Sequence, residues 1–512
     1  CYPWLFLGRG TVRGFLYFGN GRKRGKNVKK SLTRNFSVYM LKNMVSIIVP
    51  LITIPYVSRI LGPSGLGDVQ YTQSWVSYFS LIAGLGISSY AVREGAQRRD
   101  EPQKLGEFSV EIVTISFLST TVAYLSFAIF LCFFKTTGAQ PSLFLVFSLL
   151  IGATGLNTEW ICTVFEDYDY ISKRSIAFQL LSVVLLFVLV KKSGDMAAYA
   201  VVLTMPTVAT CLLNWIYGIK KIRWKYNAQT FSIKKHIKPI VYIFGVGVAS
   251  TIYTSLDSTM LGYILDSEAV GIYTVASRLT KSVLSLINAS CVVFLPRLSY
   301  YAGKDRKEFH ALSSKVINAL LAVTVPCAVG MFILAEEAIA FFSGNGFEAA
   351  VVPMRILTLN LFFSALDGFL AWQILVPLNR EKNLLAATIL GMITDAVLNT
   401  FLIPLNGVAG AAYATLIAEV CVCVVNVASC YDLVPFRAII KNIVQCILAV
   451  LPFGGVYSIC VIAGVAGMGR GFFLGVFCVL FFIFILLLMR NKTCMDLLKV
   501  MKNTIAKSKF FK

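Results

Sequence analysis

The sequence predicts an all-α, polytopic integral membrane protein with about 14 transmembrane helices. Three observations support this fold class: 57% of the 512 residues are hydrophobic, only 14% are charged, and the mean hydropathy is +0.74. A transmembrane helix requires about 20 mostly apolar residues, so this composition supplies at most ~14 of them. The same values exclude a soluble enzyme, a disordered chain and a secreted domain held together by disulfides.

The first six predicted helices form an N-lobe at residues 37–217. Each is an apolar run bounded by charged residues or by Gly and Pro. Two of them contain prolines that predict kinks, Pro50 and Pro55 in the first and Pro206 in the sixth. The fifth is short for a span. The six helices cover residues 37–60, 70–92, 108–134, 142–163, 174–190 and 197–217.

The next six predicted helices form a C-lobe at residues 238–430. The seventh contains Gly245 and Gly247, which favour a hinge or close helix packing over a phosphate-binding loop, because they follow no strand. The eleventh carries Asp395 and Asn399 within an otherwise lipid-facing pattern. The six helices cover residues 238–262, 271–296, 314–335, 352–376, 384–403 and 408–430.

Three basic segments and a final pair of helices complete the predicted organisation. The tails and the connection between the lobes are rich in Lys and Arg, and we expect all three to be cytoplasmic. The last two helices lie within residues 431–490, at 439–465 and 471–489, and the basic segments are 1–36, 218–237 and 491–512.

The distribution of Lys and Arg predicts the orientation in the membrane. Of the 47 basic residues, 38 fall on the side that holds both tails, and only Lys135, Lys191, Lys192 and Arg470 fall on the other side. Cytoplasmic loops collect Lys and Arg, so both termini are expected in the cytoplasm, with an even number of helices. The net charge of +22 is therefore explained by membrane orientation rather than by nucleic-acid binding.

A faint internal repeat relates the two lobes. Ile60, Leu61, Leu66 and Gly67 recur as Ile264, Leu265, Val270 and Gly271, an offset of 204 residues, and Glu107-Phe108 recurs as Glu308-Phe309, an offset of 201. Because each lobe has an even number of helices, the repeat predicts two six-helix lobes in the same orientation, related by an axis along the membrane normal, plus two C-terminal helices. One chain then supplies a complete path, so we expect a monomer.

The cysteines and histidines predict neither a disulfide framework nor a metal site. Most of the 13 cysteines lie in apolar runs, where Cys behaves as a small hydrophobe. Cys421 and Cys423 lie inside a predicted helix, and the two histidines, His236 and His310, fall in predicted loops far away in sequence. No P-loop motif for ATP is present in the sequence.

Two stretches resemble a known family. Residues 50–67 (PLITIPYVSRILGPSGLG) and 84–94 (GLGISSYAVRE) resemble the opening of Wzx-type polysaccharide-unit flippases, which belong to the multidrug/oligosaccharidyl-lipid/polysaccharide (MOP) exporter superfamily. A second block is similar to the helix 11 to 12 signature of that family. It consists of Asn399, Leu402-Ile403-Pro404, Gly407, Gly410-Ala411-Ala412, Ala414-Thr415 and Glu419.

The resemblance runs from about residue 28 to the end of the last predicted helix. It implies a flippase that moves oligosaccharide repeat units, linked to undecaprenyl pyrophosphate, from the inner to the outer leaflet of the bacterial cytoplasmic membrane, by alternating access and without covalent change. O-antigen, capsule and exopolysaccharide are the products it implies, with a polysaccharide polymerase and chain-length machinery as candidate partners. Members usually begin near Val28, so we expect residues 1–27 to be an upstream extension.

Basic residues inside the membrane are candidates for binding the pyrophosphate. Each costs at least ~2.5 to 3.5 kcal/mol at bilayer depth, so it should face a cavity or a partner. Arg278 and Lys281 lie three residues apart on one face of the predicted eighth helix, near mid-depth. The alternative for this pair is a buried ion pair with Asp257 on the seventh helix.

Three further basic residues lie nearer the membrane surfaces. Lys42 is in the first helix, Arg59 at its outer end and Arg355 at the outer start of the tenth. For Lys42 the alternative to pyrophosphate binding is that its side chain reaches the inner interface. For Arg59 and Arg355 the alternative is contact with lipid headgroups.

Acidic residues inside the membrane are candidates for coupling transport to H⁺ or Na⁺, since an intramembrane carboxylate can exchange either ion. Glu419 and Asp395 are predicted on adjacent helices, where they could share a proton or bond to Asn399. Asp257 and Asp367 are further candidates, with Glu111 and Glu159 closer to the inner face. The alternatives are helix-to-helix bonding without a transport role, and transport driven by the membrane potential or by use of the glycan outside. No cofactor is expected.

Two functions of other classes compete with the polysaccharide-unit flippase, and lipid flippases of another substrate class, including the lipid II type, are a further alternative. A multidrug/cation antiporter of the same superfamily predicts an acidic residue deep in the first helix, which carries Lys42 and Arg59 instead. A polymerase or ligase, the enzymatic alternative, predicts a long extracytoplasmic loop, and the longest outer connection here is about 336–351. The sequence therefore favours a transporter over an enzyme.

Overall fold

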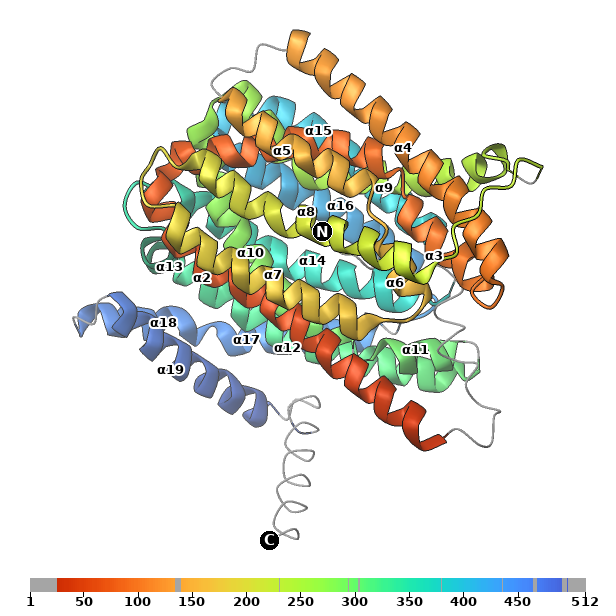
Figure 1. Cartoon of the computed structure of the whole chain (residues 1–512). Helices are drawn as coiled ribbons and strands as arrows, with labels where there is room; N and C mark the ends of the chain where they lie inside the picture. The colour runs from red at the N-terminus through yellow and green to blue at the C-terminus, as the bar shows by residue number, and fades with distance from the viewer. Residues whose placement is uncertain are drawn as a thin grey trace. The chain divides into compact units, whose positions relative to one another are not determined.

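The structure is a computed structural model, and it is entirely helical in the residues it describes (Figure 1). The described residues are 25–133, 140–229, 231–292, 294–302, 304–378, 380–434, 436–463, 467–489 and 495. Contacts within the chain divide it into two compact units, residues 1–274 and 275–512. The predicted all-α membrane fold is confirmed, whereas the lobe boundaries remain predictions.

Unit 1 contains α2 to α9 and the first turns of α10. α2 is kinked at Gly62, which has φ of +68°, followed by Pro63. Gly tolerates this left-handed backbone and Pro lacks the amide that would continue the helix, so the sequence explains the kink. The helices are α2 Gly25–Gly84, α3 Ile87–Gln97, α4 Pro102–Phe133, α5 Pro141–Gly155, α6 Glu159–Val164, α7 Tyr168–Leu189, α8 Met196–Lys221, α9 Lys234–Ile264 and α10 Ser267–Val292.

Unit 2 contains the rest of α10 and the helices that follow it. The Asp305 side chain caps α12 by accepting hydrogen bonds from the backbone amides of Lys307 and Glu308. The elements are α11 Leu295–Ala302, α12 Arg306–Ile333, α13 Ala335–Ser343, η1 Glu348–Ala350, α14 Val351–Phe369, the π-helix η2 Leu370–Leu375, α15 Glu381–Asn406, α16 Val408–Ser429, α17 Phe436–Val450, α18 Pro452–Ile462 and α19 Gly467–Leu488.

Eleven helical segments of the described part are long and apolar enough to cross a membrane. One of them, Met44–Gln97, has 54 residues, about 80 Å of helix at 1.5 Å per residue, which exceeds twice the ~30 Å bilayer core. The kink at Gly62 lies between the two helices that the sequence predicts at 37–60 and 70–92, and the length of the segment is sufficient for two crossings. The total of about 14 crossings and the two-lobe repeat remain predictions.

Two predicted loop positions are wrong. His236 and His310 lie in the first turns of α9 and α12, because both helices begin several residues before their apolar stretch. These first turns are polar, so hydropathy alone does not detect them. His236 is 1% exposed.

Small residues bring α15 and α16 together in unit 2. Ala411, Ala412 and Ala414 are fully buried, and a Cβ atom on Gly410 would lie 2.0 Å from the carbonyl oxygen of Leu402. In a membrane, such small side chains let helix backbones approach closely. The Gly410-Ala411-Ala412 part of the family signature therefore has a packing function.

We expect Gly410→Ala to destabilise the protein by about 1–3 kcal/mol, since the added methyl group must displace the α15 backbone. Thermal unfolding in detergent measures this effect. Gly454→Ala is the matched control, because a Cβ on Gly454 meets nothing within 4 Å. Equal unfolding temperatures for the two variants would contradict the proposed packing role.

Candidate functional site

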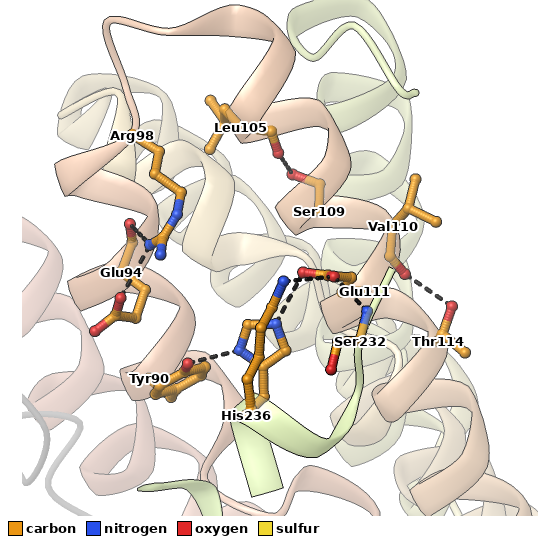
Figure 2. Close-up of polar contacts among 11 residues, drawn as sticks. Tyr90, Glu94, Arg98, Leu105, Ser109, Val110, Glu111, Thr114, Ser232 and His236 are labelled. Carbon is orange, nitrogen blue, oxygen red and sulfur yellow. Dashed lines mark hydrogen bonds and ion pairs between the residues drawn. The ribbon is translucent and has the colours of Figure 1, made fainter. Parts of the chain in front are cut away.

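A buried polar network surrounds Glu111 of α4 in unit 1 (Figure 2). Glu111 Oε1 accepts hydrogen bonds from the Ser232 backbone amide at 2.8 Å and from Lys235 Nζ at 2.7 Å. Its Oε2 lies 2.9 Å from His236 Nε2, and His236 Nδ1 lies 2.6 Å from the Tyr90 hydroxyl. If Nε2 donates to the carboxylate, Nδ1 accepts from Tyr90, so one histidine tautomer satisfies both contacts.

The Glu111 network fastens the basic connection between α8 and α9 to α4. One turn earlier on α4, Glu107 Oε1 accepts a hydrogen bond from Asn227 Nδ2 at 3.3 Å. Next to it, a Cβ on Gly106 would lie 2.0 Å from the carbonyl oxygen of Arg223. The connection therefore follows one face of α4. The sequence analysis missed this arrangement, although a carboxylate in an apolar segment and the scarcity of histidine were signals for it.

A second buried cluster lies around Arg174 of α7. Its NH2 atom donates to Glu159 Oε2 at 2.7 Å, and its NH1 atom donates to Asn214 Oδ1. Asn214 Nδ2 in turn donates to Asn157 Oδ1 at 2.7 Å. The Arg174 side chain is only 4% exposed, so the Glu159 carboxylate compensates a charge that is otherwise costly to bury.

The predicted pyrophosphate ligand Lys42 lies next to this cluster. It is partly exposed and interacts electrostatically with Glu159 and Arg174. Lys42 is therefore attracted by one group of the cluster and repelled by the other. Its predicted contact with pyrophosphate remains a prediction.

The two predicted outer ligands occupy different environments. Arg59 is exposed on α2, and its NH1 atom lies 3.5 Å from the carbonyl oxygen of Pro55. Arg355 of α14 pairs with Glu336 of α13 at 3.0 Å, and its Nε donates to the carbonyl oxygen of Phe332 at 3.4 Å. Arg355 would have to leave Glu336 to bind a pyrophosphate.

α10 carries the two mid-membrane basic candidates. Arg278 is partly buried and Lys281 is exposed, near the middle of a 26-residue helix. α10 is long enough to cross a membrane but is not among the eleven apolar segments of the described chain. A helix of this length with cations at its centre should face water, an acidic partner or an anionic ligand rather than lipid tails.

In unit 2 the structure brings together two of the predicted acidic residues, Asp367 of α14 and Glu419 of α16, which interact electrostatically. Ser364 Oγ donates to Glu419 Oε1 at 2.5 Å, and Asn426 Nδ2 donates to Asp367 Oδ1. We call the two carboxylates the Asp367–Glu419 pair, and Ser364 and Asn426 are its hydrogen-bond donors. The sequence predicts Asp395 rather than Asp367 as the neighbour of Glu419, so this pairing is a correction.

A π-helical turn directly follows the Asp367–Glu419 pair. Within η2, the backbone amide of Val376 bonds to the carbonyl oxygen of Ala371, five residues earlier, at 3.1 Å. Such turns occur frequently at functional sites because they interrupt the regular α-helical hydrogen bonding. The π-turn therefore makes this region of α14 a candidate site independently of its charges.

The other acidic candidates are also buried. Asp395 and Asn399 are 1% and 0% exposed, four residues apart on one face of α15. Asp257 of α9 accepts a hydrogen bond from the Tyr273 hydroxyl at 2.5 Å. Their ion-coupling role, and the alternative pairing of Asp257 with Arg278, remain predictions.

An ion pair outside the apolar segments holds the end of α16. Arg380 donates to both carboxylate oxygens of Asp432, at 3.0 and 2.8 Å, and to the carbonyl oxygen of Ser429 at 2.7 Å. The hydrogen bonds from Arg380 hold the pKa of Asp432 below its usual range. This contribution to stability is present above the unfolded pKa of Asp432 and is lost as the pH falls through its folded pKa.

Comparison with known proteins identifies what the fold resembles. The family model described as "Polysaccharide biosynthesis protein" matches residues 32–302. A protein named as an O-antigen transporter in Escherichia coli (strain K12) is 20% identical over 382 residues, which cover 73% of this chain and 91% of that protein. A protein named as a low-salt glycan biosynthesis flippase in Haloferax volcanii is 24% identical over 234 residues, 45% of this chain and 48% of that protein.

Solved structures of transporters share the fold. The lipid II flippase MurJ, in an inward closed conformation, matches with a TM-score of 0.70 and 16% identity, over 90% of this chain and 99% of that chain. An inward-facing multidrug transporter of the MATE family matches with a TM-score of 0.55 and 15% identity, over 77% of this chain and 95% of that chain. At these identities the likeness shows the MOP superfamily fold alone.

We expect Glu111→Gln to lower the free energy of unfolding by about 2 to 4 kcal/mol, because the variant leaves Lys235 and His236 without their buried carboxylate. Thermal unfolding in detergent tests this expectation. Glu107→Gln is the matched control on the same helix, since Glu107 is less buried. If both variants unfold at the same temperature, the Glu111 network does not anchor the connection.

Proposed function

The chain belongs to the polysaccharide biosynthesis protein family, and we propose that it is a flippase for lipid-linked oligosaccharide repeat units. The proposed substrate carries undecaprenyl pyrophosphate, and it moves from the inner to the outer leaflet of the bacterial cytoplasmic membrane by alternating access. The relatives named as an O-antigen transporter and a glycan flippase support this proposal. The protein is a multi-pass membrane transporter and not an enzyme.

The observation that carries the proposal is the placement of Arg278 and Lys281 at the centre of α10. A pyrophosphate can leave the inner headgroup layer only if fixed donors replace its hydration shell. Arg supplies a planar fork of donors and Lys a compact positive charge, and both bind phosphate oxygens strongly. A cationic drug would be repelled by the same residues, so this helix favours the flippase over the multidrug antiporter.

The other basic candidates then act at different depths. From its position in the sequence, Lys42 acts on the inner side, where the substrate enters. Arg59 and Arg355 act on the outer side, where it leaves, and Arg355 exchanges Glu336 for the pyrophosphate.

Transport against a gradient requires coupling, and we assign this role first to the Asp367–Glu419 pair. Two carboxylates that interact electrostatically hold a proton or a hard cation such as Na⁺ more readily than both hold a negative charge. Ser364 and Asn426 provide polar partners for whichever carboxylate is ionised. Asp257, Asp395 and Asn399 form the second candidate group.

The proposed topology places both termini in the cytoplasm, with the basic loops on the same side. A polysaccharide polymerase and chain-length machinery are the proposed partners, and the monomer is the proposed functional unit. The connection fastened by the Glu111 network lies on the cytoplasmic side in this topology.

We expect Arg278→Ala to slow flipping by on the order of tenfold or more, since losing a charge-assisted contact with the pyrophosphate removes about 1.5–3 kcal/mol. Purified protein in liposomes is supplied with a fluorescent polyprenyl-pyrophosphate oligosaccharide. An impermeant reagent then measures how fast the inner-leaflet label becomes accessible.

Arg278→Lys should retain part of the activity, because it preserves the charge but not the planar fork. Lys382→Ala, a change at an exposed position in the first turn of α15, is the control and should leave the rate unchanged. Normal flipping by Arg278→Ala would refute the mid-membrane cation model.

We expect Glu419→Gln to alter the dependence of flipping on pH or Na⁺, since a neutral amide next to Asp367 no longer competes with it for a proton or cation. The same liposomes, studied over a series of pH and Na⁺ gradients, measure this dependence. Glu348→Gln, at an exposed position in η1 directly before α14, is the control. An unchanged ion dependence in Glu419→Gln removes the Asp367–Glu419 pair from the coupling scheme.

A further inference from the structure

Two segments of unit 1 meet backbone to backbone, one following the α2 kink and one at the start of α10. A Cβ atom built on Gly67 would lie 1.6 Å from the carbonyl oxygen of Ser267. A Cβ atom built on Gly271 would lie 1.9 Å from the carbonyl oxygen of Pro63. Ordinary C···O contacts are roughly 3.3 Å or longer, so only glycine fits at either position. We call this contact the Gly67–Gly271 crossing.

The two halves of the crossing are reciprocal. Gly67 and Gly271 are 204 residues apart, and so are Pro63 and Ser267. Each segment therefore presents the same pair, a glycine and the carbonyl group four residues before it, to the other segment. Gly67 contacts Ser267, and Gly271, the equivalent of Gly67, contacts Pro63, the equivalent of Ser267. A two-fold axis generates this pattern of reciprocal contacts.

The offset of the crossing is also the offset of the sequence repeat. Ile60 and Leu66 recur as Ile264 and Val270 around these same glycines. The repeat and the crossing are independent observations, because one concerns residue identity and the other concerns backbone proximity. Their agreement locates the point at which the two repeats touch.

The surroundings of the crossing are tightly packed. Leu66, Val69 and Val270 are 2% exposed or less. The Ser267 side chain also hydrogen-bonds to Asp68, which is 8% exposed. At the two glycines themselves the nearest atoms across the crossing are backbone atoms, so no side-chain rotamer has to change there when the backbones separate.

We infer that the Gly67–Gly271 crossing lies on the pseudo-two-fold axis of the repeat and is a gate that closes the outer end of the transport path. The inference rests on the proposed function, since the predicted topology puts both segments on the side with few basic residues. A substrate can leave toward that side only when the crossing separates. A reciprocal contact parts symmetrically, so both repeats open by the same motion.

The first test measures access through the gate and does not depend on transport. Ser77 lies ten residues beyond Gly67 on α2, with its Oγ 3.1 Å from Ser255 Oγ. In intact spheroplasts, the labelling rate of Ser77→Cys by an impermeant thiol reagent reports opening toward the outside. The parent protein, which has 13 native cysteines, supplies the background.

Gly271→Ala should raise this labelling rate several-fold, because the new methyl group holds the two segments apart. Gly330→Ala is the matched control, since a Cβ on Gly330 meets nothing within 4 Å. If Gly271→Ala folds and its Ser77→Cys variant is labelled no faster than Ser77→Cys alone, the proposed gate is wrong. If Gly271→Ala does not fold, the labelling of Gly67→Ala and the cross-link below decide the question.

The second test closes the gate covalently. Asp68→Cys combined with Ser267→Cys should form a disulfide that blocks flipping, and a reductant should restore it, while each single variant serves as a control. If the cross-linked protein flips its substrate at the full rate, the proposed gate is wrong, and the proposed flippase function is unaffected. A parent protein that flips no lipid-linked glycan refutes the proposed function alone, and the labelling result still decides whether the crossing is a gate.

Discussion

The main physical constraint on this structure is the free-energy cost of burying charge in an apolar environment. An ionised side chain removed from water requires a partner or a polar surface. In unit 1, Glu111 accepts three hydrogen bonds and Arg174 is held by Glu159 and Asn214. The Glu111 cluster joins α4 to α9, which are distant in sequence, and the Arg174 cluster joins the consecutive helices α6, α7 and α8, so compensating each buried charge also holds helices together.

The same constraint distinguishes structural charges from candidate functional ones. Glu111 and Arg174 are buried with short contacts to partners that are themselves fixed in helices, which is typical of anchoring groups. Lys281 at the centre of α10 is exposed, and an exposed ammonium group on a helix of spanning length is expected only where water or an anion reaches it. The chemistry proposed for the substrate provides such an anion.

The fold class was predictable from the sequence because apolar content and span length are set by the bilayer and do not depend on which helices touch. The resemblance at residues 50–67 and 399–419 also identified the family. The pairing of Glu419 with Asp367 was not predictable, since it depends on the rotation of α14 and α16 about their axes. The Glu111 network was missed for a related reason: the polar first turn of α9, which carries His236, has the composition of a loop.

The π-helical turn at Leu370–Leu375 has a consequence for comparing this chain with its relatives. A π-turn holds one more residue than the α-helical turn it replaces. A plain α-helix at this point would be one residue shorter, and the residues on one side would be rotated by about 100° relative to those on the other. An ungapped alignment with a relative whose helix is regular at this point would therefore assign the residues before or after it to the wrong helix face.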